Sequence, residues 1–393
     1  MIFFDILLTL ICICILVLAS LFLLEVAIGA FSINRARVSE NKDLSDDFIV
    51  LMPAHNEALI IEETLAALRA DLGHLKKVYV IADNCSDNTA DIARSCGAQV
   101  IERNDSSRRG KGYALSKGIE DTRPQPEGII IVLDADCYVE KSALPKLAAA
   151  VKKYDRPVQA NYQLTRNSEK LSARISQFAW RVKNYLRPSG LAFLGLPCQL
   201  MGTGMAFQRA HFSGIQLGTD NIVEDMQLGI DLAVKRRSAK FLPEINVWSP
   251  MAATEQSAVT QRTRWEHGHL STIFNVFPRT FMRAVKRRDL NLLTVGLDIA
   301  IPPVSLLLLV VLINAPLTFL YTAVGGSAPL LLSLLNLSIV CVALLLAWFI
   351  VGRGLIDSSD LLKIFPFFLK KLTIYIRFFM RKPQKDWVRT DRA

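Results

Sequence analysis

Two long stretches without a charged side chain constrain the fold of this chain more than any other feature of the sequence. Residues 6–24 are nineteen uncharged, mostly apolar residues between Asp5 and Glu25. As a helix rising 1.5 Å per residue they would be roughly 30 Å long, which matches the hydrocarbon core of a bilayer. Residues 299–352 form a second uncharged stretch of 54 residues. It is too long for one helix and contains a turn signal in its middle, at Gly325, Gly326, Ser327 and Pro329. The sequence therefore predicts three membrane-spanning helices.

Basic residues beside these stretches predict their orientation. Arg35 and Arg37 follow the first stretch, Arg353 follows the second, and a basic cluster precedes the second at Arg279, Arg283, Lys286, Arg287 and Arg288. Because Lys and Arg are enriched on the cytoplasmic side of membrane proteins, the polar block between the stretches is expected in the cytoplasm. A cleaved signal peptide would carry Lys or Arg before its apolar run, whereas here Asp5 leads. We expect a multi-pass protein of the cell inner (plasma) membrane with a cytoplasmic catalytic domain.

Composition supports a membrane surface as a partner. The chain has 46 Lys and Arg against 36 Asp and Glu, a net charge of +10, and 51% hydrophobic residues. The positive charge lies next to the apolar stretches, which predicts contact with membrane lipids and no nucleic acid. Seven cysteines without CxxC spacing indicate neither a disulfide scaffold nor zinc.

The predicted organisation has five parts. They are an N-terminal transmembrane anchor (1–34), a cytoplasmic domain (35–275), a basic amphipathic juxtamembrane segment (276–298), two transmembrane helices (299–352) and a basic amphipathic interfacial tail (353–393) that contains Phe365, Phe367, Phe368 and Tyr375.

The cytoplasmic block alternates short apolar runs with segments of helical spacing. The runs are residues 48–53, 77–82, 99–101 and 128–133. This order predicts an α/β domain with a parallel sheet and right-handed crossovers. Polar clusters follow three of the runs, at residues 55–57, 83–86 and 134–136. Because ligands bind at the carboxyl ends of parallel strands, a nucleotide site is expected at this edge of the sheet, although Asp and Asn also occur in ordinary turns.

Two of these motifs carry charges that suit a metal-bound phosphate. Asp134 and Asp136 are separated by one residue at the end of an apolar run, and two such carboxylates can bind Mg²⁺ or Mn²⁺. The alternative for this pair is a capped turn. The sequence RRGKG at 108–112 places Lys111 between two glycines just before a predicted helix, where backbone amides can approach a phosphate. A solvated basic turn is the alternative there.

Two further motifs lie closer to the second apolar stretch. Glu224 and Asp225 precede an apolar-periodic segment, where they could favour the start of a helix or supply a general base. Gln261, Arg264 and Trp265 begin a predicted helix and share one face of it. Arg264 could pair with a diphosphate and Trp265 could stack on a sugar or lipid, or the segment could be an interfacial helix.

Taken in order, these segments resemble family 2 glycosyltransferases with the GT-A fold, a Rossmann-like α/β nucleotide-sugar domain with flanking transmembrane helices in this case. The matching segments are PAHNE (53–57), ADNCSDNT (82–89), RRGKGYAL (108–115), LDADC (133–137), GTGMAF (202–207), VEDMQLG (223–229) and QRTRWEHG (261–268). The QxxRW element resembles the membrane-embedded branch that includes cellulose, chitin, hyaluronan and poly-N-acetylglucosamine synthases. The segments at 82–93 and 108–115 resemble bacterial exopolysaccharide glycosyltransferases of the methanolan type. Val223 departs from the pattern, because processive synthases often have Thr there.

The resemblance implies a role for each matching residue. Residues bordering the nucleoside would be Pro53, Ala54, His55 and Glu57, with Asp83 toward the base. Asp134 and Asp136 would hold the metal on the diphosphate, and Lys111 would lie near the phosphates. Asp225 would be the general base. The acceptor and diphosphate side would be formed by Gly202, Thr203, Gly204, Glu224, Gln261, Arg264 and Trp265.

The expected activity is that of an inverting, metal-dependent hexosyl- or N-acetylhexosaminyltransferase. It would move a sugar from a nucleotide diphosphate sugar donor to a lipid-linked or growing surface-polysaccharide acceptor, with polysaccharide assembly or export proteins as further partners. Three alternatives stay open: a processive β-polysaccharide synthase, a glycolipid synthase acting on a membrane lipid, and a noncatalytic membrane scaffold.

Overall fold

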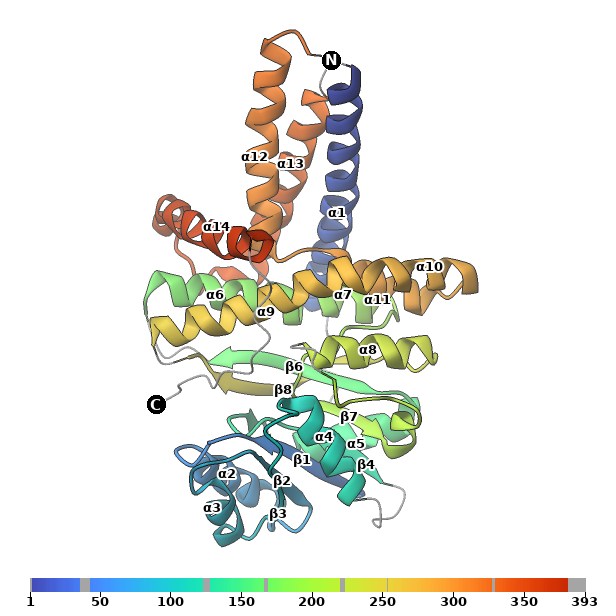
Figure 1. The fold of residues 1–393 in the computed structure, drawn as a ribbon, viewed down its shortest axis with the longest axis vertical. Coiled ribbons are helices and arrows are strands. Elements are labelled where there is room, and N and C mark those ends of the chain that lie inside the picture. The colour runs from blue at the N-terminus through green and yellow to red at the C-terminus, as the bar shows by residue number, and fades with distance from the viewer. Residues whose placement is uncertain are drawn as a thin grey trace.

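The computed structural model describes residues 2–35, 43–122, 128–165, 169–219, 223–252, 254–326 and 329–380, and within these ranges the side chains of 361–370 are left aside. Three layers follow one another along the long axis of the molecule (Figure 1). A stalk of long helices stands at one end, a layer of shorter helices lies across its base, and a domain built on a β-sheet forms the other end.

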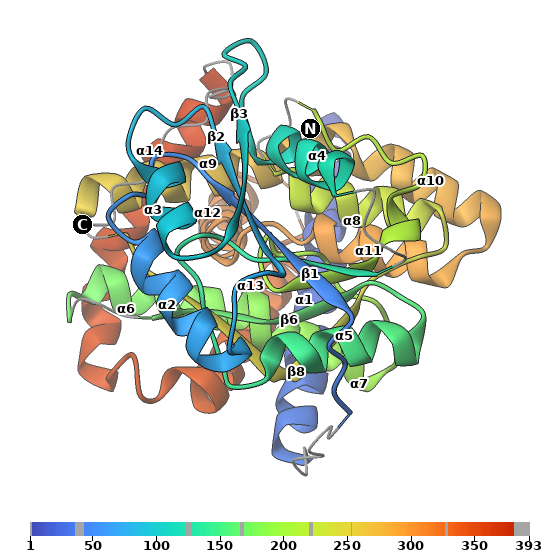
Figure 2. The ribbon, with the colours of Figure 1, turned by 90° about the horizontal axis from the view of Figure 1, so that it is seen from below.

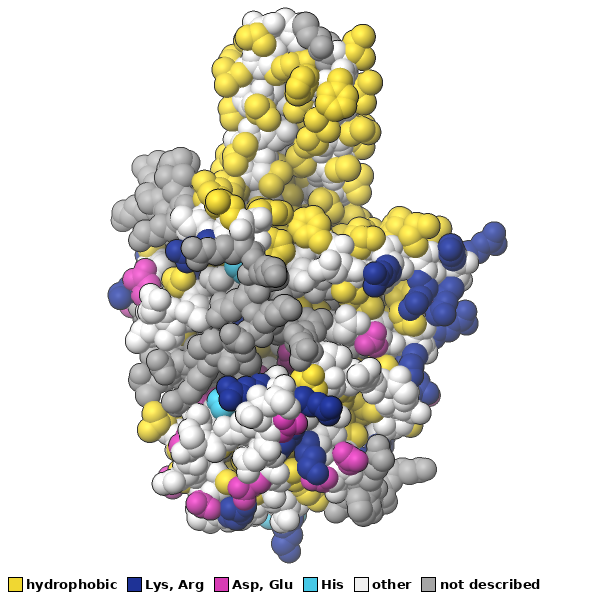
Figure 3. Space-filling view, viewed as in Figure 1, with side chains coloured by type: hydrophobic (Ala, Val, Ile, Leu, Met, Phe, Trp, Pro, Cys, Tyr) yellow, Lys and Arg dark blue, Asp and Glu magenta, His cyan; other side chains and the backbone are white. Residues whose placement is uncertain are grey.

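The stalk consists of three helices that are long and apolar enough to cross a membrane, as predicted. They are α1 (Ile2–Arg35), α12 (Val304–Ala323) and α13 (Leu330–Ala347), which continues into a π-helical turn, η3 (Trp348–Gly352). Their facing sides bury Phe22, Val311 and Val340, whereas large apolar side chains cover the outside of the stalk (Figure 3). An outer surface of this kind suits contact with lipid tails. Arg37 and Ser327, used above for orientation and for the turn, lie outside the described residues.

The middle layer contains the helices that lie across the base of the stalk (Figure 1). They are α6 (Leu171–Arg181), the π-helical turn η1 (Val182–Leu186), α7 (Arg187–Phe193), α9 (Glu255–Asn275), α10 (Phe277–Arg287), α11 (Leu290–Ala300) and α14 (Ile364–Met380), which follows the short helix η4 (Ser358–Lys363). Helix α10 buries Thr280 and Ala284 and exposes the basic side chains of Arg279, Arg283 and Lys286. Figure 3 shows a group of Lys and Arg side chains, in dark blue, at the end of the middle layer where α10 lies. Residues 381–393 and the side chains of Phe365, Phe367 and Phe368, part of the predicted interfacial tail, fall outside the description.

The sheet of the third layer has the strand order β3-β2-β1-β4-β7-β6-β8-β5. Its strands are β1 (Phe48–Ala54), β2 (Val78–Asp83), β3 (Gln99–Arg103), β4 (Ile129–Val132), β5 (Tyr138–Val139), β6 (Val158–Thr165), β7 (Met205–Gln208) and β8 (Lys240–Pro250). The four predicted strands, β1 to β4, pair in parallel as expected. The complete sheet is mixed, because β7 runs antiparallel to both β4 and β6, and β5 runs antiparallel to β8.

Alternating side chains of the central strands pack in two apolar cores, one on each face of the sheet. Val50 and Met52 of β1 pack with α2 (Ile61–Leu72) and α5 (Ala143–Tyr154). Leu51, between them, packs on the opposite face with α4 (Lys111–Asp121) and α8 (Glu224–Val234). Figure 2 shows α2 and α5 on one side of the strands and α4 and α8 on the other. Burial on both faces explains the continuous apolar runs of the central strands.

A buried ion-pair network joins the stalk to the middle layer. Arg187 of α7 donates to Glu25 Oε2 of α1 at 2.6 Å and also pairs with Asp298 of α11, while Gln199 Nε2 donates to Asp298 Oδ2 at 2.8 Å. Glu25 ends the uncharged run in the sequence, yet α1 continues to Arg35. The guanidinium of Arg187 pairs with the Glu25 carboxylate, so this charged residue can be buried within the helix. At Gly190, one turn beyond Arg187, an added Cβ would lie 2.6 Å from the backbone oxygen of Glu25, so the two helices touch through their backbones.

Replacement of Arg187 by Met is expected to lower the free energy of unfolding by about 3 kcal/mol, because it leaves two carboxylates buried without their cation. Thermal unfolding in detergent micelles measures the change. The control is Arg94→Met, which breaks an ion pair whose side chains are 47% and 49% exposed and should cost less than about 1 kcal/mol. Equal stabilities for the Arg187 and Arg94 variants would contradict the assigned role of the network.

Candidate active site

A cavity of about 360 Å³ lies between the carboxyl ends of the central strands and the middle helix layer. It brings together most of the residues singled out in the sequence, from six separate segments: Pro53, His55, Glu57, Lys111, Asp134, Asp136, Gly202, Glu224, Asp225, Gln261, Arg264 and Trp265. The cavity continues past these residues to Pro302, Pro303 and Ser305, at the start of α12. One continuous space therefore connects the sheet edge with the base of a candidate membrane helix.

Hydrogen bonds between two loops hold the residues that follow β1. His55 Nδ1 lies 2.7 Å from the carbonyl oxygen of Asp83, and the Glu57 N–H donates to Thr89 Oγ1 at 2.8 Å. Asn56 adopts a left-handed backbone conformation, with φ of 57°, and its side-chain oxygen accepts from the N–H of Ser86 at 2.7 Å. The loops after β1 and β2 therefore form one hydrogen-bonded unit that presents His55 and Glu57 to the cavity.

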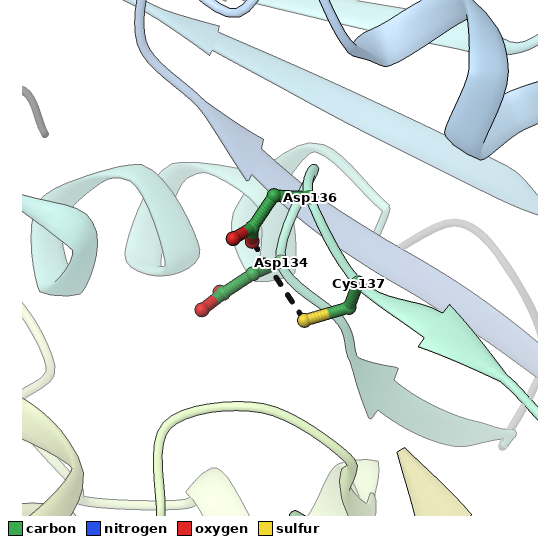
Figure 4. A group of neighbouring side chains, drawn as sticks. All are labelled: Asp134, Asp136 and Cys137. Carbon is green, nitrogen blue, oxygen red and sulfur yellow. Dashed lines mark hydrogen bonds between the residues drawn. The ribbon is translucent and has the colours of Figure 1, made fainter. Parts of the chain in front are cut away.

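Asp134 and Asp136 point to the same side at the end of β4 (Figure 4). Ligand atoms of Asp134, Asp136 and Cys137 all lie within 4.8 Å of one another. The Cys137 thiol donates to Asp136 Oδ1 at 3.7 Å and accepts from Thr203 Oγ1 at 3.3 Å. Burial, followed by the two carboxylates, keeps the pKa of Cys137 well above its usual value, so this residue is a thiol and a poor ligand for a hard cation. The two carboxylates fit Mg²⁺ or Mn²⁺ completed by phosphate oxygens.

Lys111, at the start of α4, crosses the cavity between the two acidic groups. Its Nζ pairs with Asp134 and donates to the carbonyl oxygen of Gly202 at 2.7 Å. Gly202 has φ of 89°, and a Cβ added there would lie 3.4 Å from Asp225 Oδ2 and 3.6 Å from Lys111 Nζ. Glycine therefore allows the backbone to pass close to both charged groups. Asp225, in the first turn of α8, thus faces the cavity a short distance from Lys111.

The acidic groups at this point of the cavity are shifted by their surroundings. Burial raises the pKa of Glu224 to about 7, and the neighbouring charge of Asp225 adds to the shift. Burial also raises the pKa of Asp225, although Lys111 opposes that change. Burial lowers the pKa of Lys111, but Asp134 and Glu224 more than compensate, and its pKa stays above the ordinary value. Near neutral pH, Lys111 is a cation and Glu224 is partly protonated.

Helix α9 supplies the opposite wall. It begins at Glu255, with Thr254 accepting from the N–H of Ser257 at 3.1 Å, six residues before the start predicted from the sequence at Gln261. The Trp265 ring lies 4.8 Å from the ring of Trp180, and Trp180 in turn packs edge-on against Tyr162 at 5.1 Å. Trp180 Nε1 donates to the Tyr162 carbonyl oxygen at 2.9 Å, which fixes the aromatic group beside the cavity.

Four of the predicted residues do not line the cavity: Ala54, Asp83, Thr203 and Gly204. Asp83 is 1% exposed and pairs with Arg103 at 2.5 Å, so its contact with a base stays a prediction. Thr203 Oγ1 accepts a hydrogen bond from the Asp134 N–H at 3.1 Å, which helps to position the loop that carries Asp134 and Asp136. Gly204 packs against Ala160 and Val247.

Residues that the sequence analysis missed also line the cavity, among them Tyr162, Trp180, Lys183, Arg187, Gln199, Asp298 and Ser305. No motif marks them, because they come from segments without a recognisable pattern.

The fold and the paired carboxylates define a sugar-transferring class of enzyme. Residues 49–212 match the family model described as glycosyl transferase family 2. The matched segment contains most of β1, the strands β2 to β7 and the paired carboxylates, and the mixed α/β sheet is GT-A-like, as predicted.

Two curated relatives agree with this class. The chain is 25% identical over 269 residues to a protein named probable glycosyltransferase YdaM of Bacillus subtilis (strain 168), covering 65% of this chain and 63% of that protein. It is 26% identical over 251 residues to a poly-beta-1,6-N-acetyl-D-glucosamine synthase of Staphylococcus aureus (strain COL), covering 61% of this chain and 58% of that protein. The chain thus spans less than two thirds of the length of either relative. Among solved structures, the mannosyltransferase PcManGT from Pyrobaculum calidifontis, in complex with GDP-Man and Mn²⁺, aligns with a TM-score of 0.46 and 16% identity, covering 94% of this chain and 99% of that chain.

Proposed function

We propose that the protein is an inverting, metal-dependent membrane glycosyltransferase. It moves a sugar from a nucleotide diphosphate sugar to a lipid-linked or growing surface-polysaccharide acceptor at the cytoplasmic face of the cell inner membrane. One observation supports this proposal above others: Asp134 and Asp136 share a single cavity with Asp225, and Lys111 lies between the two acidic groups. An inverting transfer needs these components on opposite sides of the anomeric carbon.

The chain's own residues divide the work of the transfer between them. Asp134, Asp136 and Lys111 would receive the diphosphate, and Arg264 on α9 would add a second cation to the leaving group. Asp225 takes the proton of the acceptor hydroxyl while the hydroxyl oxygen forms a bond to the anomeric carbon. The bond from that carbon to the diphosphate oxygen breaks, and its electron pair leaves with the nucleoside diphosphate. Asp225 faces the cavity beside Gly202, and burial raises its pKa, which suits a group that must take a proton.

Asp134 and Asp136 are the residues that would hold Mg²⁺ or Mn²⁺, which neutralises charge on the leaving diphosphate when bound. The thiol of Cys137 stays outside the ligand set, because it is occupied by its hydrogen bonds to Thr203 and Asp136. Lys111 already contacts Asp134, and its ammonium could also pair with a phosphate oxygen of the donor.

A panel of nucleotide sugars incubated with the purified protein and Mn²⁺ or Mg²⁺ tests the proposal. Release of nucleoside diphosphate from one donor, abolished by EDTA and restored by the metal, is the expected result. Absence of release from every donor, with or without added glycan and lipid acceptors, would overturn the proposed function.

The pH dependence of turnover is expected to follow Asp225. Because the base acts in its ionised form, kcat falls as pH drops through the raised pKa of Asp225. In the variant Lys111→Met the cation that opposes this shift is gone, so the acid limb moves to higher pH, on the order of one unit. The profile is measured as normalised kcat at saturating donor. Lys117→Met, which removes an exposed lysine of the same helix paired with Asp121, leaves the limb in place. A limb at unchanged or lower pH in Lys111→Met would contradict the assignment.

A processive β-polysaccharide synthase is the second candidate function. The match to a poly-beta-1,6-N-acetyl-D-glucosamine synthase favours it, whereas Val223 lies where processive enzymes often carry Thr. Product size distinguishes the two: a single added sugar supports the first function, and a ladder of products supports the second.

A further inference from the structure

The wall of the cavity that faces the middle helix layer carries a lysine that the proposed transfer does not use. Lys183 lines the cavity from η1, the π-helical turn that joins α6 to α7. Short π-helical turns within α-helices are rare and occur often at functional sites. Asn184, the next residue of the same turn, also lines the cavity and is 3% exposed.

The position of the π-helical turn is fixed from the stalk. Arg187 directly follows the turn and is held by Glu25 of α1 and by Asp298 of α11. Gly190 then rests on the backbone of α1. Because both contacts are buried, the turn cannot rotate freely, and Lys183 is kept directed toward the cavity.

Lys183 forms no hydrogen bond or ion pair with any residue in the described part of the chain. Its neighbour Arg187 has two carboxylate partners, so the charges of that side chain are balanced within the protein. Burial lowers the pKa of Lys183, the charge of Asp225 opposes this, and Arg187 lowers it further. Lys183 is partly buried in the wall of the cavity. An ammonium there without a contacting counter-ion has lost part of its hydration, and an anionic ligand would compensate that loss.

The location of Lys183 distinguishes it from the cations near the donor. After burial, the charge of Asp225 has the largest effect on the pKa of Lys183. The other charges that shift this pKa are those of Arg187 on α7, Asp298 on α11 and Glu266 on α9. The donor side of the cavity is formed by the ends of β1 and β4 and by the start of α4, and in the proposed reaction Arg264 of α9 also reaches the leaving diphosphate. Beyond Lys183 the cavity continues to Pro302 and Ser305 at the base of α12. Lys183 therefore lies beside the general base of the proposed reaction, toward the membrane.

We propose that Lys183 binds a phosphate group on the acceptor, so that the acceptor is a sugar joined to a membrane lipid through a phosphate or diphosphate. This inference rests on the proposed function and names the acceptor class for the same site. The acceptor hydroxyl would meet Asp225, the phosphate would pair with Lys183, and the lipid chain would leave past the start of α12. A neutral glycan primer offers Lys183 no counter-ion.

Binding without donor gives the most direct test, because it does not depend on turnover. The full-length protein in neutral detergent is titrated with a polyprenyl diphosphate monosaccharide, with the octyl glycoside of the same sugar, and with phosphatidylglycerol. We expect the diphosphate-linked sugar to bind at least tenfold more tightly than the octyl glycoside. In Lys183→Met its affinity should fall about tenfold or more, since a hydrogen bond between charged groups is lost. Lys183→Arg should restore most of the affinity.

Two controls separate this role from a structural one. Lys141→Met removes an exposed lysine outside the cavity and should bind all three ligands as the wild type does. The donor KM of Lys183→Met should stay within about twofold of the wild-type value. It is measured at high pH, where Asp225 is ionised in both proteins. Equal losses for the charged and the neutral acceptor in Lys183→Met, or binding of phosphatidylglycerol as tightly as the diphosphate-linked sugar, would overturn the inference.

The outcomes also separate this inference from the proposed function. If no nucleotide sugar is turned over but the selective binding and its loss in Lys183→Met are observed, the enzyme proposal fails and the anion site stands. If turnover is observed with equal use of neutral and phosphate-linked acceptors, the enzyme proposal stands and the role of Lys183 is refuted.

Discussion

Asp225→Asn is expected to reduce kcat by about a thousandfold while the donor KM changes little. Asn has the size of Asp and can keep the position of the side chain in the first turn of α8, but it cannot take a proton from the acceptor. The neighbouring Glu224 is a poor substitute. Consecutive residues of a helix point in different directions, and the pKa of Glu224, about 7, leaves its carboxylate partly protonated near neutral pH. The loss should therefore appear in the chemical step rather than in donor binding.

The measurement is nucleoside diphosphate release at saturating donor and acceptor. Asp231→Asn is the matched control, because Asp231 lies on the same helix, accepts a hydrogen bond from Gln227 at 2.9 Å and does not line the cavity. It should keep kcat within about threefold of the wild type. Turnover by Asp225→Asn within tenfold of the wild type would remove Asp225 from the mechanism.

Asp136→Asn is expected to abolish most metal-dependent turnover, with a loss in kcat/KM on the order of a hundredfold to a thousandfold. Asp136 is 4% exposed, and among the described residues Asp134 is the other carboxylate in the same group of candidate ligand atoms. An amide offers a neutral oxygen, which binds Mg²⁺ or Mn²⁺ much more weakly than a carboxylate does. Donor affinity should fall with metal affinity, because the cation joins the diphosphate to the protein.

The metal affinity is measured by titration of Mn²⁺ in the presence of a nucleoside diphosphate. Cys137→Ser provides the comparison: its Sγ lies within the same group of ligand atoms, yet its hydrogen bonds and raised pKa make it a thiol. We expect this variant to retain wild-type metal affinity. If Asp136→Asn still needs the metal at the wild-type concentration, Asp136 is not a ligand.

Local patterns in the sequence predicted the elements whose environment is uniform. The strands β1, β2 and β4 are continuous apolar runs because both of their faces are covered, and the polar residues that follow them could be placed at one edge of the sheet. The three candidate membrane helices were equally clear, since a helix that crosses a bilayer needs a long uncharged run. Where the environment changes along an element the pattern was less informative. Strand β8, for example, alternates buried and partly buried residues in its second half and contains Pro243, and no strand was predicted there.

The second half of the cavity could not be predicted for a different reason. Glu25 and Arg187 are 162 residues apart, and Arg187 and Asp298 are 111 residues apart. An ion pair of this kind leaves no spacing in the sequence, because each partner looks like an isolated charge in an apolar or helical segment. Lys183 was missed for the same reason: its position depends on a π-helical turn and on a helix of the stalk that packs against it.

The sequence by itself determined the class of domain, the three apolar helices and the acidic and basic motifs at the edge of the sheet, since each of these depends on neighbours within a few residues along the chain. Only the tertiary structure decided that the motifs share one cavity, that this cavity extends to the base of α12, and that Lys183, which has no hydrogen-bond or ion-pair partner among the described residues, lies near Asp225. Those facts arise from contacts between distant segments, whose energies depend on burial and on charge separation in space rather than on order along the chain.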